Sequence, residues 1–206
     1  MKGFRLADLD PVEAYKLMLG VVTPRPIALV TTMGDNGVVN AAPFSFFNAI
    51  AFNPCMVVLG VEARPDRRPK DTSANIRELP EFVVNIVDRT LADAMNLCAL
   101  PLAPGQSEVD LAGLDTAASE TVRPPRIAQA PAALECRRHT TLQLGNLREI
   151  VVGEVLRIVV RGDLLEAGRL RVDQTRIDTI GRLGGDLYAT TRDRFALSRP
   201  EPIQGS

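Results

Sequence analysis

The strongest constraint on the fold of this chain is a series of short β-branched runs joined by short connections. We expect strands over 27–33, 38–45, 55–61, 82–87, 133–144 and 150–160. Gly34-Asp35-Asn36-Gly37, between the first two runs, is typical of a hairpin turn. A parallel sheet needs a crossover of about a dozen residues between successive strands, and most of these connections are too short for one. The pattern therefore predicts a mainly β protein, an antiparallel barrel with short helices.

Three short helices are expected around these strands. The first follows an Asp10-Pro11 pair that suits an N-cap and a first helical position. The second covers 71–79 and is ended by a proline. The third covers 91–100, with Thr90 and Asp93 in capping-box spacing.

The chain is expected to form one domain over 1–206, with the barrel at about 22–165 and a C-terminal segment at 166–206. Residues 101–131 are rich in Pro, Ala and Gly, and we interpret them as a long excursion from the barrel. Gly153 inside the last long strand predicts a β-bulge.

Composition excludes several classes of protein. The chain has 206 residues, with 24 Lys and Arg against 25 Asp and Glu, and the two signs are interspersed. Because nucleic-acid binding needs clustered cationic charge, no nucleic-acid partner is expected. No apolar run reaches the roughly 18 to 20 residues that span a bilayer, and residues 1–10 contain no signal-peptide core. We expect a cytoplasmic protein without a membrane partner.

Few side chains are suited to catalysis. Cys55, Cys98 and Cys136 form no CxxC pair and are predicted to be buried small hydrophobic residues, so no metal site is expected. His139 is the single histidine of the sequence. A nucleophile elbow, a dinucleotide fingerprint and a phosphate-binding loop motif are all absent. If the chain is an enzyme, no catalytic side chain can be named, and a bound cofactor carries the chemistry.

The segment 40–48, NAAPFSFFN, has unusual aromatic spacing. Side chains alternate between the faces of a strand, so three phenylalanines within four residues cannot all point inward. Together with Pro43, this spacing predicts a strand that leaves its sheet. Its backbone N–H groups and the Ser45 hydroxyl would then be free to bind a ligand. A bulged strand with an aromatic core plug is the alternative interpretation.

A second segment, beginning at Lys70, combines the groups that bind phosphate. A lysine precedes Asp71 and a Thr/Ser-rich helix start, which places a cation, hydroxyl donors and unpaired N–H groups together. Arginines at 64, 67 and 68 could add to it. Asp71 fits such a site only if it caps the helix or pairs with one of these arginines. An ordinary helix start with solvated charges is the alternative.

Taken in order along nearly the whole chain, several stretches resemble the flavin reductase-like family of FMN-binding split barrels, in its flavoprotein-oxygenase and flavoredoxin-type branch. The matching stretches are PRPIALVTT at 24–32, NAAPFSFFN at 40–48, FNP at 52–54, KDT at 70–72 with Asn75, FVVN at 82–85, LEC at 134–136, VGEV at 152–155, and RLGG at 182–185 with Tyr188 and Arg199-Pro200.

This resemblance implies a six-stranded antiparallel Greek-key split barrel that forms a homodimer with FMN at the subunit interface. It assigns the isoalloxazine ring and ribityl chain to Thr31, Thr32, Ser45, Phe46 and Phe47. It assigns the phosphate and ribityl end to Lys70, Asp71, Thr72 and Asn75, and it places Arg182 and Tyr188 near the flavin pocket.

The expected function is that of an FMN-binding oxidoreductase in which NADH or NADPH donates a hydride to flavin N5. Hydride transfer needs a positioned nicotinamide and no protein acid or base, in keeping with the single histidine. Three alternatives stay open. They are an FMN electron-transfer protein reduced by a protein partner, a flavin-dependent oxygenase, and a barrel that has lost its flavin.

Overall fold

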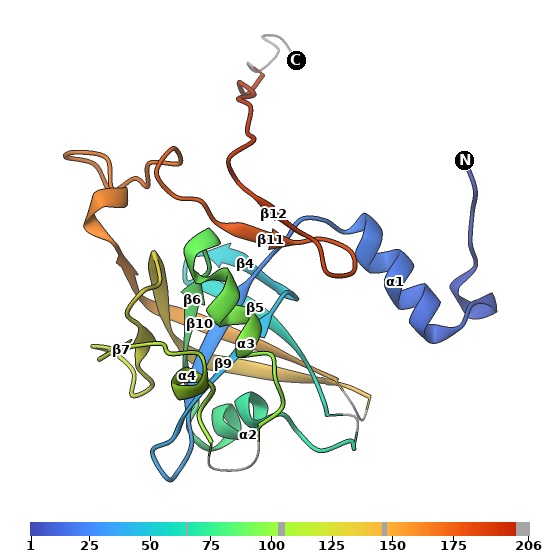
Figure 1. Ribbon diagram of the computed structural model, residues 1–206, viewed down its shortest axis with the longest axis horizontal. Helices are drawn as coiled ribbons and strands as arrows, with labels where there is room; N and C mark the ends of the chain where they lie inside the picture. Colours follow the sequence, from blue (N-terminus) through green and yellow to red (C-terminus); the bar gives the residue numbers. More distant parts are fainter. Residues whose placement is uncertain (65, 103–105, 146–147, 201–206) are drawn as a thin grey trace.

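The computed structural model describes residues 1–64, 66–102, 106–145 and 148–200. Its main element is a seven-stranded antiparallel sheet with the strand order β3-β2-β6-β9-β10-β5-β4 (Figure 1). The mainly β fold predicted from the strand spacing is confirmed. The strands of this sheet are β2 (Ala28–Met33), β3 (Val39–Phe44), β4 (Phe47–Phe52), β5 (Cys55–Glu62), β6 (Glu81–Ile86), β9 (Ala132–Leu144) and β10 (Arg148–Val160).

The sheet closes on itself where β3 becomes β4. These two strands are consecutive in the chain yet lie at opposite ends of the strand order, so β3 pairs with β2 and β4 pairs with β5. Ser45 and Phe46 form the bend between them, and the Gly60 N–H of β5 donates to the Phe46 carbonyl at 2.7 Å. Counted as one bent strand, β3 and β4 bring the barrel to the six strands that the family resemblance implies.

The predicted turn and bulge both form. Gly37 ends the β2–β3 turn with a φ of +78°, a backbone conformation that glycine adopts without strain. In the β9–β10 hairpin the register shifts between Val152 and Gly153, which confirms the predicted bulge. A Cβ at Gly153 would come within 2.4 Å of the Phe82 ring, so glycine at this position lets the ring lie against the backbone.

Four α-helices surround the barrel among the described residues: α1 (Pro11–Val21), α2 (Asp71–Glu78), α3 (Ala92–Leu97) and α4 (Glu108–Leu111). The Asp10 carboxylate accepts the Val12 N–H at 2.8 Å, which confirms the predicted N-cap of α1. The helix predicted over 71–79 is confirmed as α2. None of the described helices is long and apolar enough to cross a membrane.

The helix predicted over 91–100 is shorter, and its capping was assigned to the wrong residues. The segment starts as a 3-10 turn, η2 (Arg89–Leu91), and continues as α3. Asp88 provides the cap, because its carboxylate accepts the N–H groups of Thr90 and Leu91 at 3.1 Å. Thr90 donates its hydroxyl to the same carboxylate instead of capping the helix itself.

The predicted excursion, residues 101–131, contains α4 and a two-stranded ribbon, and the C-terminal segment pairs with the start of the barrel region. The ribbon consists of β7 (Thr116–Ala117) and β8 (Arg126–Ile127). The second small sheet has the order β1-β11-β12, with bounds Arg25–Pro26, Ile180–Arg182 and Tyr188–Thr190. Short 3-10 turns η1 (Leu6–Asp8) and η3 (Gly162–Leu164) complete the elements of the described chain.

The buried guanidinium of Arg25 joins α1 to the C-terminal segment. It donates to the carbonyls of Leu19 and Val22 at 2.8 and 2.7 Å and to the Leu183 carbonyl at 2.9 Å. These acceptors include the C-terminal carbonyls of α1, where a cation is favourable. The rest of α1 projects from the barrel and has no buried residue (Figure 1).

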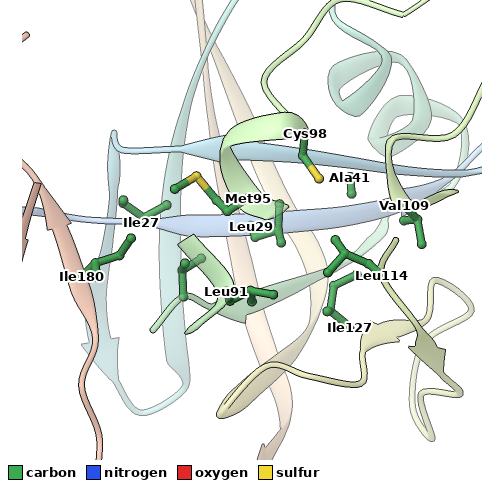
Figure 2. Close-up of a cluster of buried hydrophobic side chains, with 11 residues drawn as sticks. Ile27, Leu29, Ala41, Leu91, Met95, Cys98, Val109, Leu114, Ile127 and Ile180 are labelled. Carbon is green, nitrogen blue, oxygen red and sulfur yellow. The ribbon is translucent and has the colours of Figure 1, made fainter. Parts of the chain in front are cut away.

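The apolar core lies on both sides of the sheet. One cluster fills the barrel, with Phe82 and Leu59 fully buried. The other lies between the outer face of β2 and β3 and the covering helices α3 and α4, and it includes Leu29, Met95 and Val109 (Figure 2).

The cysteines differ in environment. Cys98 and Cys136 are buried as predicted, but Cys55 is exposed beside the β4–β5 turn, so the prediction of three buried cysteines is wrong for that residue. Burial raises the pKa of both Cys98 and Cys136 to about 12, which keeps them as neutral thiols at neutral pH.

A buried carboxylate fastens the 119–125 loop to the barrel. Glu135 on β9 accepts the Thr121 N–H at 2.7 Å, the Thr121 hydroxyl at 2.6 Å and the Glu120 N–H at 3.1 Å. Burial opposes its ionisation, but these donors, with Arg157 nearby, outweigh that effect and lower the pKa of Glu135.

Replacing Glu135 with glutamine is expected to reduce the free energy of unfolding by about 1 kcal/mol at neutral pH. A carboxylate with a lowered folded-state pKa stabilises the fold above its unfolded-state pKa, and this stabilisation is lost as the pH falls through the folded-state value. Glu135→Gln should therefore flatten the acid side of the stability profile. Urea denaturation at several pH values measures both effects, and an unchanged acid slope would contradict this assignment.

Candidate functional site

The N-terminus of α2 is the most distinctly cationic feature of the barrel end. Lys70 occupies the N-cap position, and no side chain caps the helix. The first-turn N–H groups of a helix have no partner inside it, and the helix dipole adds positive character there. Lys70 forms no ion pair with the described residues, and its ammonium lies 5.5 Å from the centre of the Phe44 ring. The arrangement favours an anion.

The two aspartates near Lys70 are paired with arginines. Arg64 binds Asp71 at 2.5 Å, so the condition under which Asp71 suits a phosphate site is met. Arg68 binds Asp66 at 2.7 Å. Two of the three upstream arginines are thus engaged by carboxylates, whereas Arg67 and Lys70 form no ion pair with the described residues.

A buried amide network ties α2 to the β2–β3 hairpin. The Asn40 amide donates to the hydroxyls of Thr32 and Thr72 at 3.3 and 3.1 Å. The Asn75 amide donates to the same Thr32 hydroxyl at 3.0 Å. This network brings Thr32 together with Thr72 and Asn75, which the resemblance assigns to different ends of the flavin. It adds Asn40, which sequence reasoning placed in the aromatic segment only.

Thr31 anchors the excursion to the barrel. Its hydroxyl donates to the Pro125 carbonyl at 2.6 Å and accepts the Asn85 amide at 3.2 Å. Thr31 and Thr32 are fully buried in the single chain, and neither lines one of the hollows described below. Their assignment to a flavin therefore remains a prediction, while their visible role is structural.

The bend between β3 and β4 borders a large, mostly apolar hollow. Ser45, Phe46 and Phe47 line a cavity of about 910 Å³ that lies between the barrel and α1, from which Tyr15 and Met18 contribute. The strand pairing is interrupted at Ser45 and Phe46, but β3 and β4 belong to the same sheet, so the segment bends within the sheet instead of leaving it as predicted. Ser45, Phe46 and Phe47 are half-buried. Phe44 is buried and Phe47 packs against the barrel core, so the core-plug alternative holds for Phe44 and in part for Phe47.

Gly60 supports this bend, and sequence reasoning did not single it out. A Cβ at Gly60 would lie 2.8 Å from the Phe46 Cβ, so the side chain of Phe46 rests against bare backbone. A glycine inside an apolar strand run is the available signal, because such glycines mark close approaches.

Replacing Gly60 with alanine is expected to lower the free energy of unfolding by about 1 kcal/mol, because the added methyl overpacks against Phe46. Gly162→Ala is the matched control, since nothing lies within 4 Å of a Cβ there. Thermal or urea unfolding of the two variants measures the difference. Equal stability of both variants would contradict the contact.

The groups at the start of α2 line a second hollow. Lys70, Asp71 and Thr72 border a cavity of about 620 Å³, together with Pro43 and Glu108. Glu62 borders both this hollow and the larger one. In the single chain, therefore, the aromatic bend and the Lys70 segment face two hollows that share Glu62 as a lining residue.

Arg182 and Tyr188 are not brought to either hollow. They line a third one of about 410 Å³ between α3 and the β11–β12 pair. The Arg182 guanidinium stacks 4.6 Å from the centre of the Tyr188 ring and hydrogen-bonds its hydroxyl. Within one chain these two residues form a separate pair, and their place near a flavin remains a prediction.

Glu108 in the second hollow was missed by sequence reasoning, because a single glutamate in a Pro- and Ala-rich stretch gives no signal. Its carboxylate accepts the Ala41 N–H at 3.1 Å. Burial raises the pKa of Glu108. His139 is exposed on β9, and the described residues contain no cluster of three His, Cys, Asp or Glu that could hold a metal ion.

Comparison with known proteins now identifies the chain. Residues 20–180 match the model of the flavin reductase like domain. The chain belongs to the flavin reductase-like family. Its fold agrees with that of the split barrel domain of a Shewanella frigidimarina protein, which is 19% identical with a TM-score of 0.81 over 98% of this chain and 100% of that one.

Two solved structures are more similar to this flavin reductase-like protein. The 2-nitrobenzoate 2-nitroreductase of Pseudomonas fluorescens is 36% identical, with a TM-score of 0.90 over 99% of this chain and 100% of that chain. Component B of the nitrilotriacetate monooxygenase of Bacillus cereus is 34% identical, with a TM-score of 0.90 over 96% and 98%. Both support a flavin-related oxidoreductase function.

Proposed function

We propose that this flavin reductase-like protein binds FMN and acts as an oxidoreductase that takes its electrons from NADH or NADPH. The observation that carries the proposal is the uncapped N-terminus of α2. There Lys70, without an ion-pair partner among the described residues, borders a hollow that shares Glu62 with the hollow at the aromatic bend.

The donor set fits the phosphate end of FMN. A phosphate carries close to two negative charges at neutral pH, and it suits a helix N-terminus and an ammonium group. Lys70 would bind it by a charge-assisted hydrogen bond, with the first-turn N–H groups of α2. The network from Asn40 and Asn75 would hold Thr72 and α2 in position for this contact.

The bend fits the ring end. Ser45 and Phe46 interrupt the strand pairing, so their backbone groups would contact the polar edge of an isoalloxazine, while Phe47 and Tyr15 would exclude water from its faces. When bound, FMN supplies hydride acceptance at N5. The chain then needs to bind and orient its ligands, which is consistent with an exposed His139 that lies outside the described hollows.

We further propose a cytoplasmic homodimer of single-domain subunits with FMN at the interface. The α1 helix supports this, because it has no buried residue and exposes Val12, Tyr15 and Met18 beside the larger hollow. A helix that is apolar on most of its surface needs a covering partner. A second copy would cover it and could join the separate hollows of one chain into one site.

Reduction of a nitroaromatic compound is a second candidate function. The similarity to a 2-nitrobenzoate 2-nitroreductase favours it, as does a hollow of about 910 Å³ with an apolar, aromatic lining, which has room for a flat ring. Oxidation of NADH by the FMN-loaded protein, with and without 2-nitrobenzoate, distinguishes this from flavin reduction alone.

The deciding experiment is the absorption spectrum of the purified protein, followed by titration with FMN and by anaerobic addition of NADH and then NADPH. We expect a flavin spectrum that bleaches with one of the two nucleotides. Protein that takes up no FMN would contradict the proposal. Bleaching by a reduced ferredoxin-type donor, but not by either nucleotide, would replace it with an electron-transfer function.

A further inference from the structure

Glu108 places a buried carboxylate in the wall of the hollow that Lys70 borders. It begins α4, is 7% exposed, and reaches across to β3, where it accepts the Ala41 N–H at 3.1 Å. Lys70 and Thr72 line the same hollow of about 620 Å³. Glu108 lies in the first turn of α4, where a carboxylate is favourable, but its side chain also reaches β3 and borders the hollow.

The hydrogen bonds of this carboxylate come from backbone groups. Within residues 1–64, 66–102, 106–145 and 148–200, its donors are the N–H groups of Ala41 and of Glu108 itself, and it joins no ion pair with Lys, Arg or His. Burial outweighs these donors and the more distant Arg64, and it raises the pKa of Glu108. Cys98 lies beside it, but its pKa of about 12 keeps that thiol neutral. Because a buried carboxyl group is costly without several hydrogen-bond donors, a ligand that brings hydroxyl groups into the hollow would stabilise it.

The hollow has a cationic side at Lys70 and an acidic side at Glu108, and the two sides suit different parts of a ligand. Lys70 and the α2 N-terminus favour a phosphate, whereas an acceptor such as the Glu108 carboxylate would repel one and would bind hydroxyl donors. A ligand that satisfies both ends is a phosphorylated polyol.

We propose that Glu108 accepts hydrogen bonds from the ribityl hydroxyl groups of FMN while the phosphate lies at Lys70. This inference rests on the proposed function. It makes Glu108 a binding residue that selects flavins carrying a hydroxylated chain.

The test compares three flavins that differ only in this chain: FMN, riboflavin, which lacks the phosphate, and lumiflavin, which lacks both the phosphate and the hydroxyl groups. Dissociation constants are measured by flavin fluorescence for the wild type, Glu108→Gln and Glu108→Ala. Glu78→Gln is the matched control, because Glu78 is exposed on α2. Unfolding midpoints of all the variants are recorded in parallel.

We expect Glu108→Gln to raise the dissociation constants of FMN and riboflavin by the same factor, about tenfold, and to leave that of lumiflavin unchanged. Glu108→Ala should produce the same selectivity with a larger factor, and Glu78→Gln should bind all three flavins as the wild type does.

Three results overturn the inference while the proposed function stands. Equal loss for all three flavins means that Glu108 only supports the fold, loss for FMN alone means that it contacts the phosphate, and no loss means that it faces no ligand. A wild-type protein that binds no FMN overturns the proposed function and this inference with it.

Discussion

Replacing Phe82 with alanine is expected to lower the free energy of unfolding by about 3–5 kcal/mol, the largest effect anticipated for a single substitution in this chain. Phe82 is fully buried, and it is the largest of the fully buried side chains. Its ring lies against the backbone of Gly153 at the bulge of β10, so truncation removes contacts on both sides of the barrel core. Urea denaturation monitored by circular dichroism measures the loss.

Two variants keep this prediction specific. Phe195→Ala is the control, because Phe195 is 84% exposed and its removal should leave stability unchanged. Phe82→Leu should lower the free energy of unfolding by less than Phe82→Ala does. Gly153→Ala should lower it by less in the Phe82→Leu background than in the wild type, because the smaller side chain leaves room for the new methyl group. A cost below about 1 kcal/mol for Phe82→Ala would contradict the packing described here.

Replacing Lys70 with alanine is expected to raise the dissociation constant for FMN roughly 10- to 150-fold, which corresponds to a charge-assisted contact of about 1.5–3 kcal/mol. The physical reason is that Lys70 occupies the N-cap position of α2 and forms no ion pair with a carboxylate of the described residues. Fluorescence titration of the flavin gives the constant directly.

Riboflavin provides the internal control for Lys70. Since riboflavin has no phosphate, Lys70→Ala should leave its affinity unchanged, and Lys70→Arg should retain most of the affinity for FMN. Lys16→Ala removes an exposed lysine on α1 and should affect neither ligand. Unchanged binding of FMN by Lys70→Ala would show that Lys70 is only a solvated charge.

Local patterns were enough to predict most of the barrel. The β2–β3 hairpin follows from a β-branched run, a Gly-containing turn and a second apolar run, all within some twenty residues. The bulge at Gly153 was predicted from the placement of a glycine inside a strand. These features depend on residues that are close together in the chain, so the local sequence is enough to predict them.

Features that depend on distant partners were not predictable in the same way. Thr31 and Pro125 are 94 residues apart, and Asn40 and Thr72 are 32 apart, yet each pair shares a hydrogen bond inside the fold. The third helix was misassigned because Asp88, just upstream, offered a stronger acceptor than Thr90.

The candidate site shows the same division. The aromatic and the lysine-led segments were recognised from their composition, and in the structure they border two hollows that share Glu62. Their residue-by-residue assignment to FMN came from the family resemblance and still awaits the binding experiments. Glu108 contacts β3 and Gly60 contacts Phe46, and no pattern in the sequence around either residue predicts these contacts.

The bend at Ser45 and Phe46 has a consequence for how occupancy could be detected. β3, before the bend, pairs with β2, and β4, after it, pairs with β5, so the bend joins the two ends of the strand order and closes the barrel. A ligand bound at the bend would contact both strands and stabilise the closed barrel. Any ligand that binds only the folded form shifts the unfolding equilibrium toward the folded state. Heat resistance should therefore rise with saturation, so a melting scan can report ligands that have no colour of their own.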